Sequence, residues 1–253
     1  MRRQPRSIHP GSDWTTEVSS AYALAGFLAL VFVGFTLLTM GPLVAIDGFF
    51  NIRTPPPGWV PVLHVLDRMG QRAVCLPVLG IAVYRVVRET KSWRPIIVVI
   101  LSVLALNFVV GILKIGLGRG EPGTGDPSFF VGGMAFPSGH TSNMVLVYGL
   151  MPYLLTSYGT IHRRTAYILS VAVVALSLLM VGVSLTLNWH WFADLIGGLL
   201  IGGMVLSLTS GIDHAIPLDI FARGWRDGLR RIPGVILTSG SRPVPRRRPL
   251  QPH

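Results

Sequence analysis

Charged side chains are scarce in this chain of 253 residues. They make up 13 % of it, whereas a soluble domain usually carries about 25 %. Half of the residues are hydrophobic, and the mean hydropathy is +0.56. A surface that faces lipid produces such a deficit of charge. The composition therefore disfavours a soluble domain and indicates an integral membrane protein.

Cysteine and lysine are nearly absent as well. Cys75 is the sole cysteine, which excludes an intrachain disulfide, and its apolar surroundings predict a small buried side chain. Lysine occurs twice against twenty arginines, a bias typical of a GC-rich bacterial genome. This bias favours a bacterial plasma membrane as the location of the protein.

Long apolar runs divide the chain into six segments. A helix needs about 20 apolar residues to cross a bilayer. The second and fourth runs are shorter, but each extends backwards through less apolar residues, to Leu66 and to Ser138 respectively. The sequence therefore predicts an all-α polytopic membrane protein with six transmembrane helices. They lie at roughly Ala21–Ile46, Ala73–Val87, Pro95–Leu113, Ser142–Leu155, Ala166–Leu187 and Trp191–Leu208.

Basic residues are unevenly shared between the two sides that six spans define. With the N-terminus inside, seventeen Arg and Lys residues lie on the inner side and five on the outer side. Cytoplasmic loops carry the excess of basic residues, so both termini are expected in the cytoplasm. The same distribution assigns the net charge of +11 to the membrane surface, and no nucleic-acid partner is expected.

The six runs also set the expected domain boundaries. We expect a disordered cytoplasmic tail over residues 1–20, a six-helix membrane domain over residues 21–210 and a basic cytoplasmic tail over residues 211–253. In the loop after the first span, apolar residues recur at helical spacing over Val60–Gln71. This pattern predicts a short amphipathic helix at the outer interface.

Three polar clusters fall on the outer face in this topology. They are Leu113–Pro122 at the end of the third span, Phe136–Thr141 at the start of the fourth and Asn188–Asp194 at the start of the sixth. Taken singly, each has an ordinary explanation. Lys114 suits an interfacial lysine, Ser138 a helix N-cap, and His190 with its flanking tryptophans an interfacial belt. Taken together, they bring polar groups from distant segments to one membrane level, which indicates a site.

The residue types of two clusters suit a bound phosphate. A helix N-terminus offers free N–H groups to an anion. Gly139 lets the anion approach the backbone closely, and Ser138 can donate a further hydrogen bond. Lys114 adds a compact positive charge.

The third cluster adds groups that can react with that phosphate. His190 and Asp194 are four residues apart, so on a helix they share one face. The carboxylate can then hold one imidazole nitrogen and leave the other free to attack, as in other activated nucleophiles. His140 is placed to protonate a leaving oxygen. A metal site built from His140, His190 and Asp194 is the weaker alternative, and we expect neither a metal nor a cofactor.

With these residues, the sequence resembles the type 2 phosphatidic acid phosphatase superfamily, which contains the lipid phosphate phosphatases. The family has the motifs Lys-x6-Arg-Pro, Pro-Ser-Gly-His and Ser-Arg-x5-His-x3-Asp. The second motif is intact at Pro137-Ser138-Gly139-His140, and His190 and Asp194 match the third. The order and spacing agree over roughly residues 20–210. The resemblance implies a six-helix bundle in which Lys114, Ser138 and Gly139 bind the phosphate.

The chain departs from the family pattern at both arginines of the motifs. Glu121 follows Lys114 where the first motif has Arg, and Ser184 stands where the third has it. Each arginine would make charge-assisted hydrogen bonds to the phosphoryl group, and a glutamate there repels it. Glu121 and Ser184 are thus expected to modulate the choice of substrate. Arg119 is expected either to bind phosphate in place of one arginine or to pair with Glu121.

The resemblance implies metal-independent hydrolysis of a lipid or polyprenyl phosphate or pyrophosphate at the outer face. His190 would be the nucleophile that becomes a phosphohistidine, Asp194 its orienting carboxylate and His140 the general acid. Two alternatives stay open: a head-group phosphotransferase of the same superfamily, and a catalytically silent lipid-binding or scaffold protein. The expected partners are membrane lipids and the lipid or polyprenyl phosphate substrate.

Overall fold

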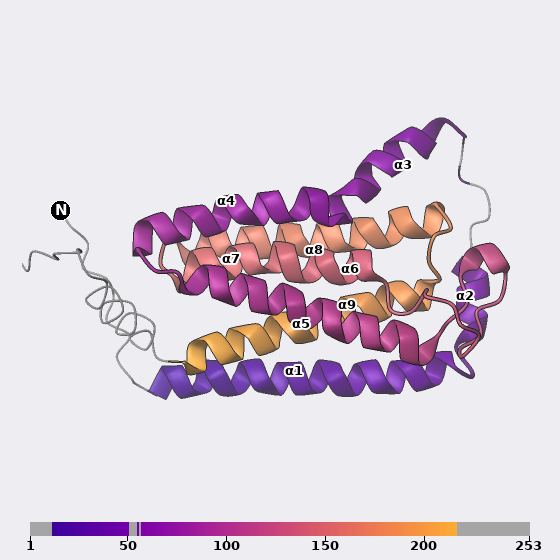
Figure 1. The fold of residues 1–253 in the computed structure, drawn as a ribbon, viewed down its shortest axis with the longest axis horizontal. Helices are drawn as coiled ribbons and strands as arrows, with labels where there is room; N and C mark the ends of the chain where they lie inside the picture. The colour runs from indigo at the N-terminus through magenta and orange to yellow at the C-terminus, as the bar shows by residue number, and fades with distance from the viewer. Residues whose placement is uncertain (1–11, 51–54, 56, 217–253) are drawn as a thin grey trace, which may run out of the picture. The chain divides into compact units, whose positions relative to one another are not determined.

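The computed structural model describes residues 12–50, 55 and 57–216, and every regular element among them is helical. The helices are α1 (Ser12–Thr39), α2 (Val44–Phe50), α3 (Val60–Asp67), α4 (Arg72–Thr90), α5 (Arg94–Leu117), α6 (Gly139–Asn143), α7 (Gly149–Ser157), α8 (Arg163–Thr186) and α9 (Phe192–Ala215). Short turns join them: η1 (Pro57–Trp59), η2 (Arg68–Gly70), η3 (Pro122–Thr124) and the π-helical η4 (Met144–Tyr148). In Figure 1, α2, α3 and the loop between α5 and α6 gather at the right-hand end.

Four helices are long and apolar enough to cross a membrane: α1, α5, α8 and α9. A fifth span results if α3 and α4, which are bent by 49° relative to one another, are counted as one. The chain is thus an integral membrane protein. The predicted run Ser142–Leu155 falls on α6, η4 and α7, each of which is short, so the count of six remains a prediction.

The predicted boundaries differ from the observed ones at three places. The first span ends at Thr39 instead of Ile46, because Gly41 and Pro42 break the helix and α2 starts anew after them. At the N-terminus, α1 already begins at Ser12, inside the predicted tail of residues 1–20. At the other end, α9 continues to Ala215, beyond the predicted boundary at residue 210. Residues 1–11 and 217–253 of the predicted tails lie outside the described residues.

Large apolar side chains are exposed along three of the long helices. On α1 they include Leu24, Phe27, Leu30 and Leu37; on α5, Ile100, Leu104, Phe108 and Ile112; and on α8, Ile168, Val171, Val174 and Leu178. Exposed patches of this size are rare on soluble monomers. We assign these faces to contact with the lipid chains.

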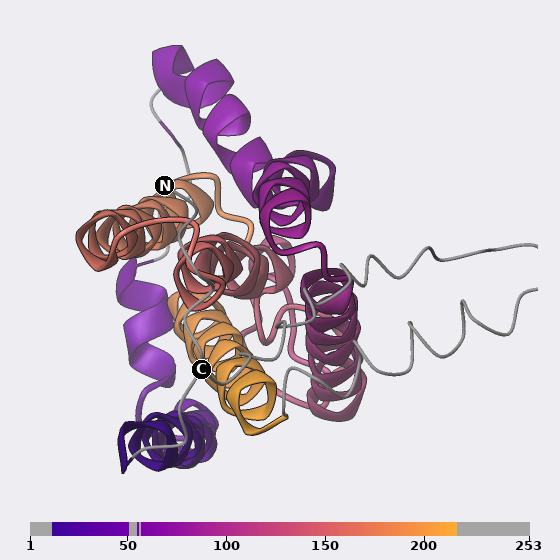
Figure 2. The same ribbon diagram turned by 90° about the vertical axis from the view of Figure 1, so that its left-hand side faces the viewer.

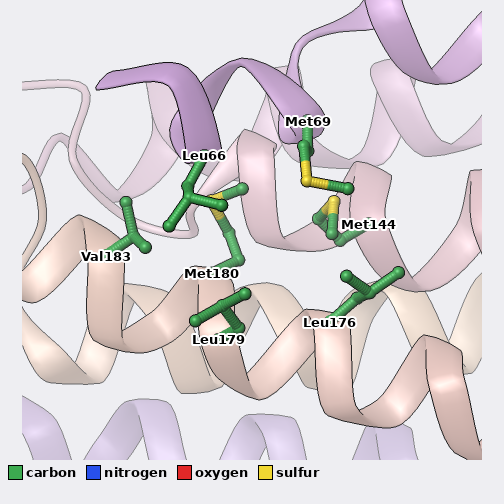
Figure 3. Close-up of a pocket in the computed structure, with 7 residues that line it drawn as sticks. All are labelled: Leu66, Met69, Met144, Leu176, Leu179, Met180 and Val183. Carbon is green, nitrogen blue, oxygen red and sulfur yellow. The ribbon is translucent and has the colours of Figure 1, made fainter. Parts of the chain in front are cut away.

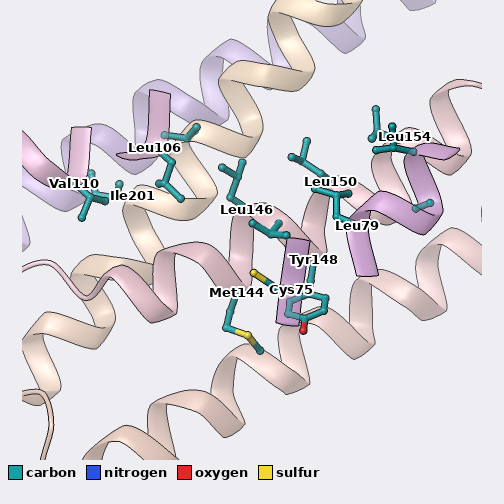
Figure 4. Packing of buried hydrophobic residues seen from close by; sticks show 14 of the residues in the cluster. Cys75, Leu79, Leu106, Val110, Met144, Leu146, Tyr148, Leu150, Leu154 and Ile201 are labelled. Atoms are coloured by element: carbon teal, nitrogen blue, oxygen red, sulfur yellow. The ribbon is translucent and has the colours of Figure 1, made fainter. Parts of the chain in front are cut away.

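The segment α6–η4–α7 lies at the centre of the bundle. Most of it is buried, and it packs against α4, α5, α8 and α9. Figure 4 shows Leu146 and Leu150 of this segment beside Leu79 of α4 and Leu106 of α5. Polar side chains at its start bond locally, as when Ser142 Oγ donates to the carbonyl of Ser138 at 2.7 Å. The short fourth run of the sequence is therefore a helix surrounded by protein.

Close packing of α9 on this central segment fixes two parts of the site relative to each other. A Cβ added at Gly198 would lie 2.6 Å from the carbonyl oxygen of Ser138, and one at Gly202 would lie 2.7 Å from that of Ser142. Only glycine allows backbones to approach this closely, as in other membrane helix pairs. The start of α6 and the start of α9 are thereby held together.

The short helix α3 leans away from the other helices, as Figure 2 shows. It confirms the helix predicted within Val60–Gln71. Its inner side closes over a small apolar cavity lined by Leu66 and Met69 from α3 and η2, Met144 from η4, and Leu176, Leu179, Met180 and Val183 from α8 (Figure 3). The hydroxyl of Tyr148 donates to the carbonyl of Met69 at 3.0 Å, which ties η2 to the central segment.

Candidate active site

A cavity of about 470 Å³ opens at the end of the bundle where α5 ends and α9 begins. It is lined by Lys114 of α5, by Glu121, Pro122 and Gly123 of the following turn, by Met134 and Ala135 of the loop before α6, and by Asn188, Trp189 and His190 of the loop before α9. The structure thus brings parts of the first and third polar clusters together around one hollow. Its volume falls within the usual range of small-molecule sites.

His190 lies in the loop before α9, and Asp194 is the third residue of that helix. The expected reason for their proximity, one face of a shared helix, is therefore wrong. A capping arrangement brings them together instead: Asp194 Oδ2 accepts the backbone N–H of Trp191 at 2.9 Å and lies 3.4 Å from His190 Nδ1. Such bonds are often long in an empty site and shorten when a substrate is bound.

Asp194 is fully buried, and its other oxygen is held by Arg119. Nη1 of Arg119 donates to Asp194 Oδ1 at 2.7 Å, and Nη2 donates to Oδ2 of Asp47 on α2. The guanidinium is itself 0 % exposed. Its Nε donates to the carbonyl of Pro127 at 3.0 Å, and its Cζ lies 4.8 Å from the ring centre of Phe129. One cation therefore joins two buried carboxylates, so none of the three charges is isolated.

Asp47 also caps α9 from outside that helix. Its Oδ1 accepts the backbone N–H of Ala193, the second residue of α9, at 2.8 Å. Near that point, Nε1 of Trp191 donates to the carbonyl of Gly120 at 2.8 Å. Unpaired N–H groups at the start of a helix favour such acceptors and a negative charge. The first turn of α9 is thus fixed to α2 and to the loop after α5.

The sequence-based role of Arg119 needs a correction. We expected it to bind phosphate or to pair with Glu121, but its guanidinium is buried between Asp47 and Asp194 and is not among the residues that line the cavity. The exposed Glu121 lines the cavity instead. The physical reason is burial: the buried carboxylates of Asp194 and Asp47 need a cation, and Arg119 supplies it through direct ion pairs.

Lys114 is the basic side chain at the cavity. It is half-buried, and its Nζ donates to the carbonyl of Met134 on the opposite wall. The carboxylates of Asp194 and Glu121 are the acidic groups whose charges act on it. A half-buried ammonium beside His190 can attract an anionic group to the imidazole.

The second polar cluster lies at the start of α6, outside the cavity lining. Ser138 is the N-cap of α6, with its hydroxyl accepting the N–H of Thr141 at 3.4 Å. Its own N–H donates to the carbonyl of Asp194 at 2.9 Å. Ser138 is buried, whereas Gly139 and His140 are half-buried, and none of the three lines the cavity in this structure. Ser184 is also buried, and its hydroxyl contacts the sulfur of Met180 at 3.7 Å.

Three polar residues at this end were missed by the sequence analysis: Asp47, His64 and Asp67. Asp47 ends the first apolar run and Asp67 ends the amphipathic helix, so an ionisable side chain beside apolar residues was the available signal. The His64 ring lies 5.5 Å from that of Trp189, which places α3 beside the third cluster. No group of three metal-ligating side chains occurs in the part of the chain that the structure describes.

The buried network predicts an unequal response of two arginines to the same substitution. Arg119→Met leaves Asp47 and Asp194 buried without their cation, which costs about 3–5 kcal/mol. We expect the melting temperature in detergent to fall by roughly 10 °C. Arg85→Met is the matched control, because Arg85 pairs with Glu89 while their side chains are 57 % and 47 % exposed. It should change stability by less than about 0.5 kcal/mol. Equal melting temperatures for the two variants would contradict the assigned role of Arg119.

Comparisons with known proteins show which family and fold this chain is similar to. Residues 95–215 match the model of the PAP2 superfamily, that of the type 2 phosphatidic acid phosphatases. Phosphatidylglycerophosphatase B of Bacillus subtilis (strain 168) is 26 % identical over 160 residues, which cover 61 % of this chain and 75 % of that protein. The crystal structure of a transmembrane PAP2 type phosphatidylglycerolphosphate phosphatase from Bacillus subtilis superimposes with a TM-score of 0.66 at 20 % identity, covering 77 % of this chain and 98 % of that one. Residues 95–215 of this chain, which contain every motif residue named above, thus match the PAP2 superfamily, and the fold is that of a solved PAP2 type phosphatase.

Proposed function

We propose that this protein is a membrane phosphatase that cleaves a lipid or polyprenyl phosphate through a phosphohistidine. One observation carries the proposal: Lys114 and His190 line one cavity, and the Asp194 carboxylate contacts His190 with one oxygen and Arg119 with the other. A histidine whose Nδ1 is held by a carboxylate presents Nε2 as the nucleophile. The named activities of the relatives point to the same class of reaction.

The reaction divides into two steps. In the first, Nε2 of His190 attacks phosphorus, the bond from phosphorus to the lipid oxygen breaks, and His140 gives that oxygen a proton. In the second, water attacks the phosphohistidine while His140 takes a proton from it, and inorganic phosphate leaves. Lys114 and the start of α6 at Ser138 and Gly139 bind the phosphoryl oxygens. Because His140 does not line the cavity, a phosphate that reacts with both histidines has to extend beyond the residues that line it.

Apolar side chains around the cavity support a lipid substrate. The loop that contributes Met134 to the lining also exposes Phe130 and Val131, and Trp189 is exposed on the opposite side. Aromatic and apolar residues with polar neighbours are typical of membrane–water interfaces. A lipid can thus present its phosphate to His190 while its chains stay in the bilayer.

The expected product and adduct test this function directly. Purified protein should release phosphate from at least one member of a panel of lipid and polyprenyl phosphates, and should trap an acid-labile, base-stable phosphoryl group. His190→Ala should abolish both, because it removes the attacking nitrogen. His162→Ala, at an exposed histidine before α8, is the matched control and should leave both unchanged. Absence of turnover and adduct in the wild-type protein would favour the silent-scaffold alternative.

We further propose that six spans place the cavity outside and both described ends of the helical bundle inside. The distribution of basic residues supports this orientation. Cys75 is 0 % exposed, so single cysteines can be added to the natural sequence with little background. Cysteines at Pro57 and Gly123 should react with an impermeant maleimide on intact cells, and one at Ser92, in the turn between α4 and α5, only after permeabilisation. Labelling at position 92 from outside would reverse the orientation.

Glu121 favours a second candidate function, head-group transfer. Its carboxylate lines the same cavity as His190 and Lys114, where it repels phosphate but can accept a hydrogen bond from a hydroxyl. A hydroxyl bound there could replace water as the acceptor of the phosphoryl group. In hydrolysis, water attacks the phosphohistidine in the second step. In transfer, a hydroxyl group bound by Glu121 attacks it instead.

Charge reversal at Glu121 distinguishes the two functions. Glu121→Arg should tighten inhibition by orthovanadate roughly ten- to a hundred-fold, since a charge-assisted contact is worth about 1.5–3 kcal/mol. Under transfer, the same variant should also raise phosphate release and suppress the transferred product. Asp126→Arg makes the same change of charge on the same loop outside the cavity lining, and it should have little effect. Unchanged inhibition in Glu121→Arg would show that Glu121 does not oppose the phosphate.

A further inference from the structure

Asp67, the last residue of α3, is a buried carboxylate. Its side chain is 0 % exposed, and neither oxygen has a hydrogen-bond partner of ordinary geometry within the described ranges. An ionised carboxylate in such surroundings is costly unless a cation stands close by. Asp67 does not line the cavity of the site.

The groups around Asp67 are histidines of the proposed site. The charge of His140 acts on it most strongly, followed by those of His64 and His190, and the Gln71 side chain is its polar neighbour. The turn η2 follows Asp67 directly, and its Gly70 lies against His140. A Cβ added at Gly70 would be 3.3 Å from Cδ2 of the His140 ring and 3.4 Å from its Cβ.

Two further contacts join η2 to the segment that continues from α6, and they stabilise the contact between η2 and His140. The hydroxyl of Tyr148, on the segment that continues from α6, donates to the carbonyl of Met69 in η2 at 3.0 Å. Met69 and Met144 also line the same small apolar cavity, as Figure 3 shows. Asp67 and His140 are therefore carried by two segments that are fixed to each other.

The charges facing His140 come from four segments. Asp67 of α3 favours a protonated imidazole, whereas Arg72 of α4, Lys114 of α5 and His190 before α9 oppose it, as does burial of the ring. A general acid has to carry its proton before the reaction starts. Among the groups that act on His140, Asp67 is the one whose charge keeps that proton in place.

We propose that Asp67 is a positioning residue that orients His140 and holds it in the protonated form, so that His140 can donate to the leaving oxygen. The inference rests on the proposed function. As the bond from phosphorus to oxygen breaks, the proton passes from His140 to that oxygen and His140 becomes neutral. When water attacks the phosphohistidine, His140 takes a proton from the water and again carries a positive charge that the charge of Asp67 favours. The carboxylate stays ionised throughout.

The test compares two substrates that differ in their need for an acid. The full-length Asp67→Asn variant is assayed in detergent with dioctanoyl phosphatidic acid, whose alkoxide is a poor leaving group, and with 4-nitrophenyl phosphate, whose phenolate leaves unaided. We expect kcat/KM to fall about 100-fold for the first substrate and less than about 3-fold for the second. The alkaline limb of the pH profile for the first should move to lower pH, because His140 loses its proton more readily. Asp126→Asn removes an exposed carboxylate at the same end and should change neither.

Two further variants make every outcome decisive. In a His140→Gln background, Asp67→Asn should cause no further loss, because the carboxylate acts through His140. Asp67→Leu replaces the unpaired carboxylate by an apolar group of similar size, and it should fold and behave like Asp67→Asn. Equal loss on both substrates, an unmoved pH profile, or loss of the fold in both Asp67 variants would overturn the inference while the proposed function stands. A wild-type protein that turns over no member of the panel of lipid and polyprenyl phosphates would end the proposed function, and this inference with it.

Discussion

The ionic contact of Arg119 with Asp47 and Asp194 is the interaction on which the rest of the site depends. It joins three segments that are distant in sequence: α2, the loop after α5 and the first turn of α9. A buried ion pair is weak as a source of stability, because desolvation of the charges offsets most of their attraction. Its effect here is geometric. Asp194 has one oxygen fixed by a cation, so its other oxygen can face His190 in a single orientation.

The remainder of the site is arranged around this fixed point by packing. Glycines of α9 bring its backbone against the start of α6, and Trp191 reaches back to the loop that carries Arg119. The cavity then lies between elements whose relative positions are already set. Lys114 and Glu121 place opposite charges on its wall, so a bound head group would meet both a cation and an acceptor of hydrogen bonds.

Motif residues and long apolar runs were sufficient to predict the family and the helical membrane fold. They were insufficient for Arg119, because a single sequence does not reveal that Asp47, 72 positions earlier, lies beside it. The proximity of His190 and Asp194 was predicted for the wrong reason, since the start of α9 lies after His190 and element boundaries are the least certain part of a sequence reading. Asp67 was hidden for a similar reason: its surroundings come from α6 and the loop before α9, which no local pattern places next to α3.

The central position of α6–η4–α7 bears on how spans are counted in bundles of this kind. Hydropathy measures how well a segment suits lipid, and this segment is covered by protein on nearly all sides. It can therefore contain Thr141, Ser142 and Asn143 in sequence and a π-helical turn without exposing any of them to hydrocarbon. The segment that begins with the best preserved motif is thus absent from the helices that length and hydropathy alone mark as spans. In this chain, such a test finds α1, α5, α8 and α9 and passes over the segment that the other helices surround.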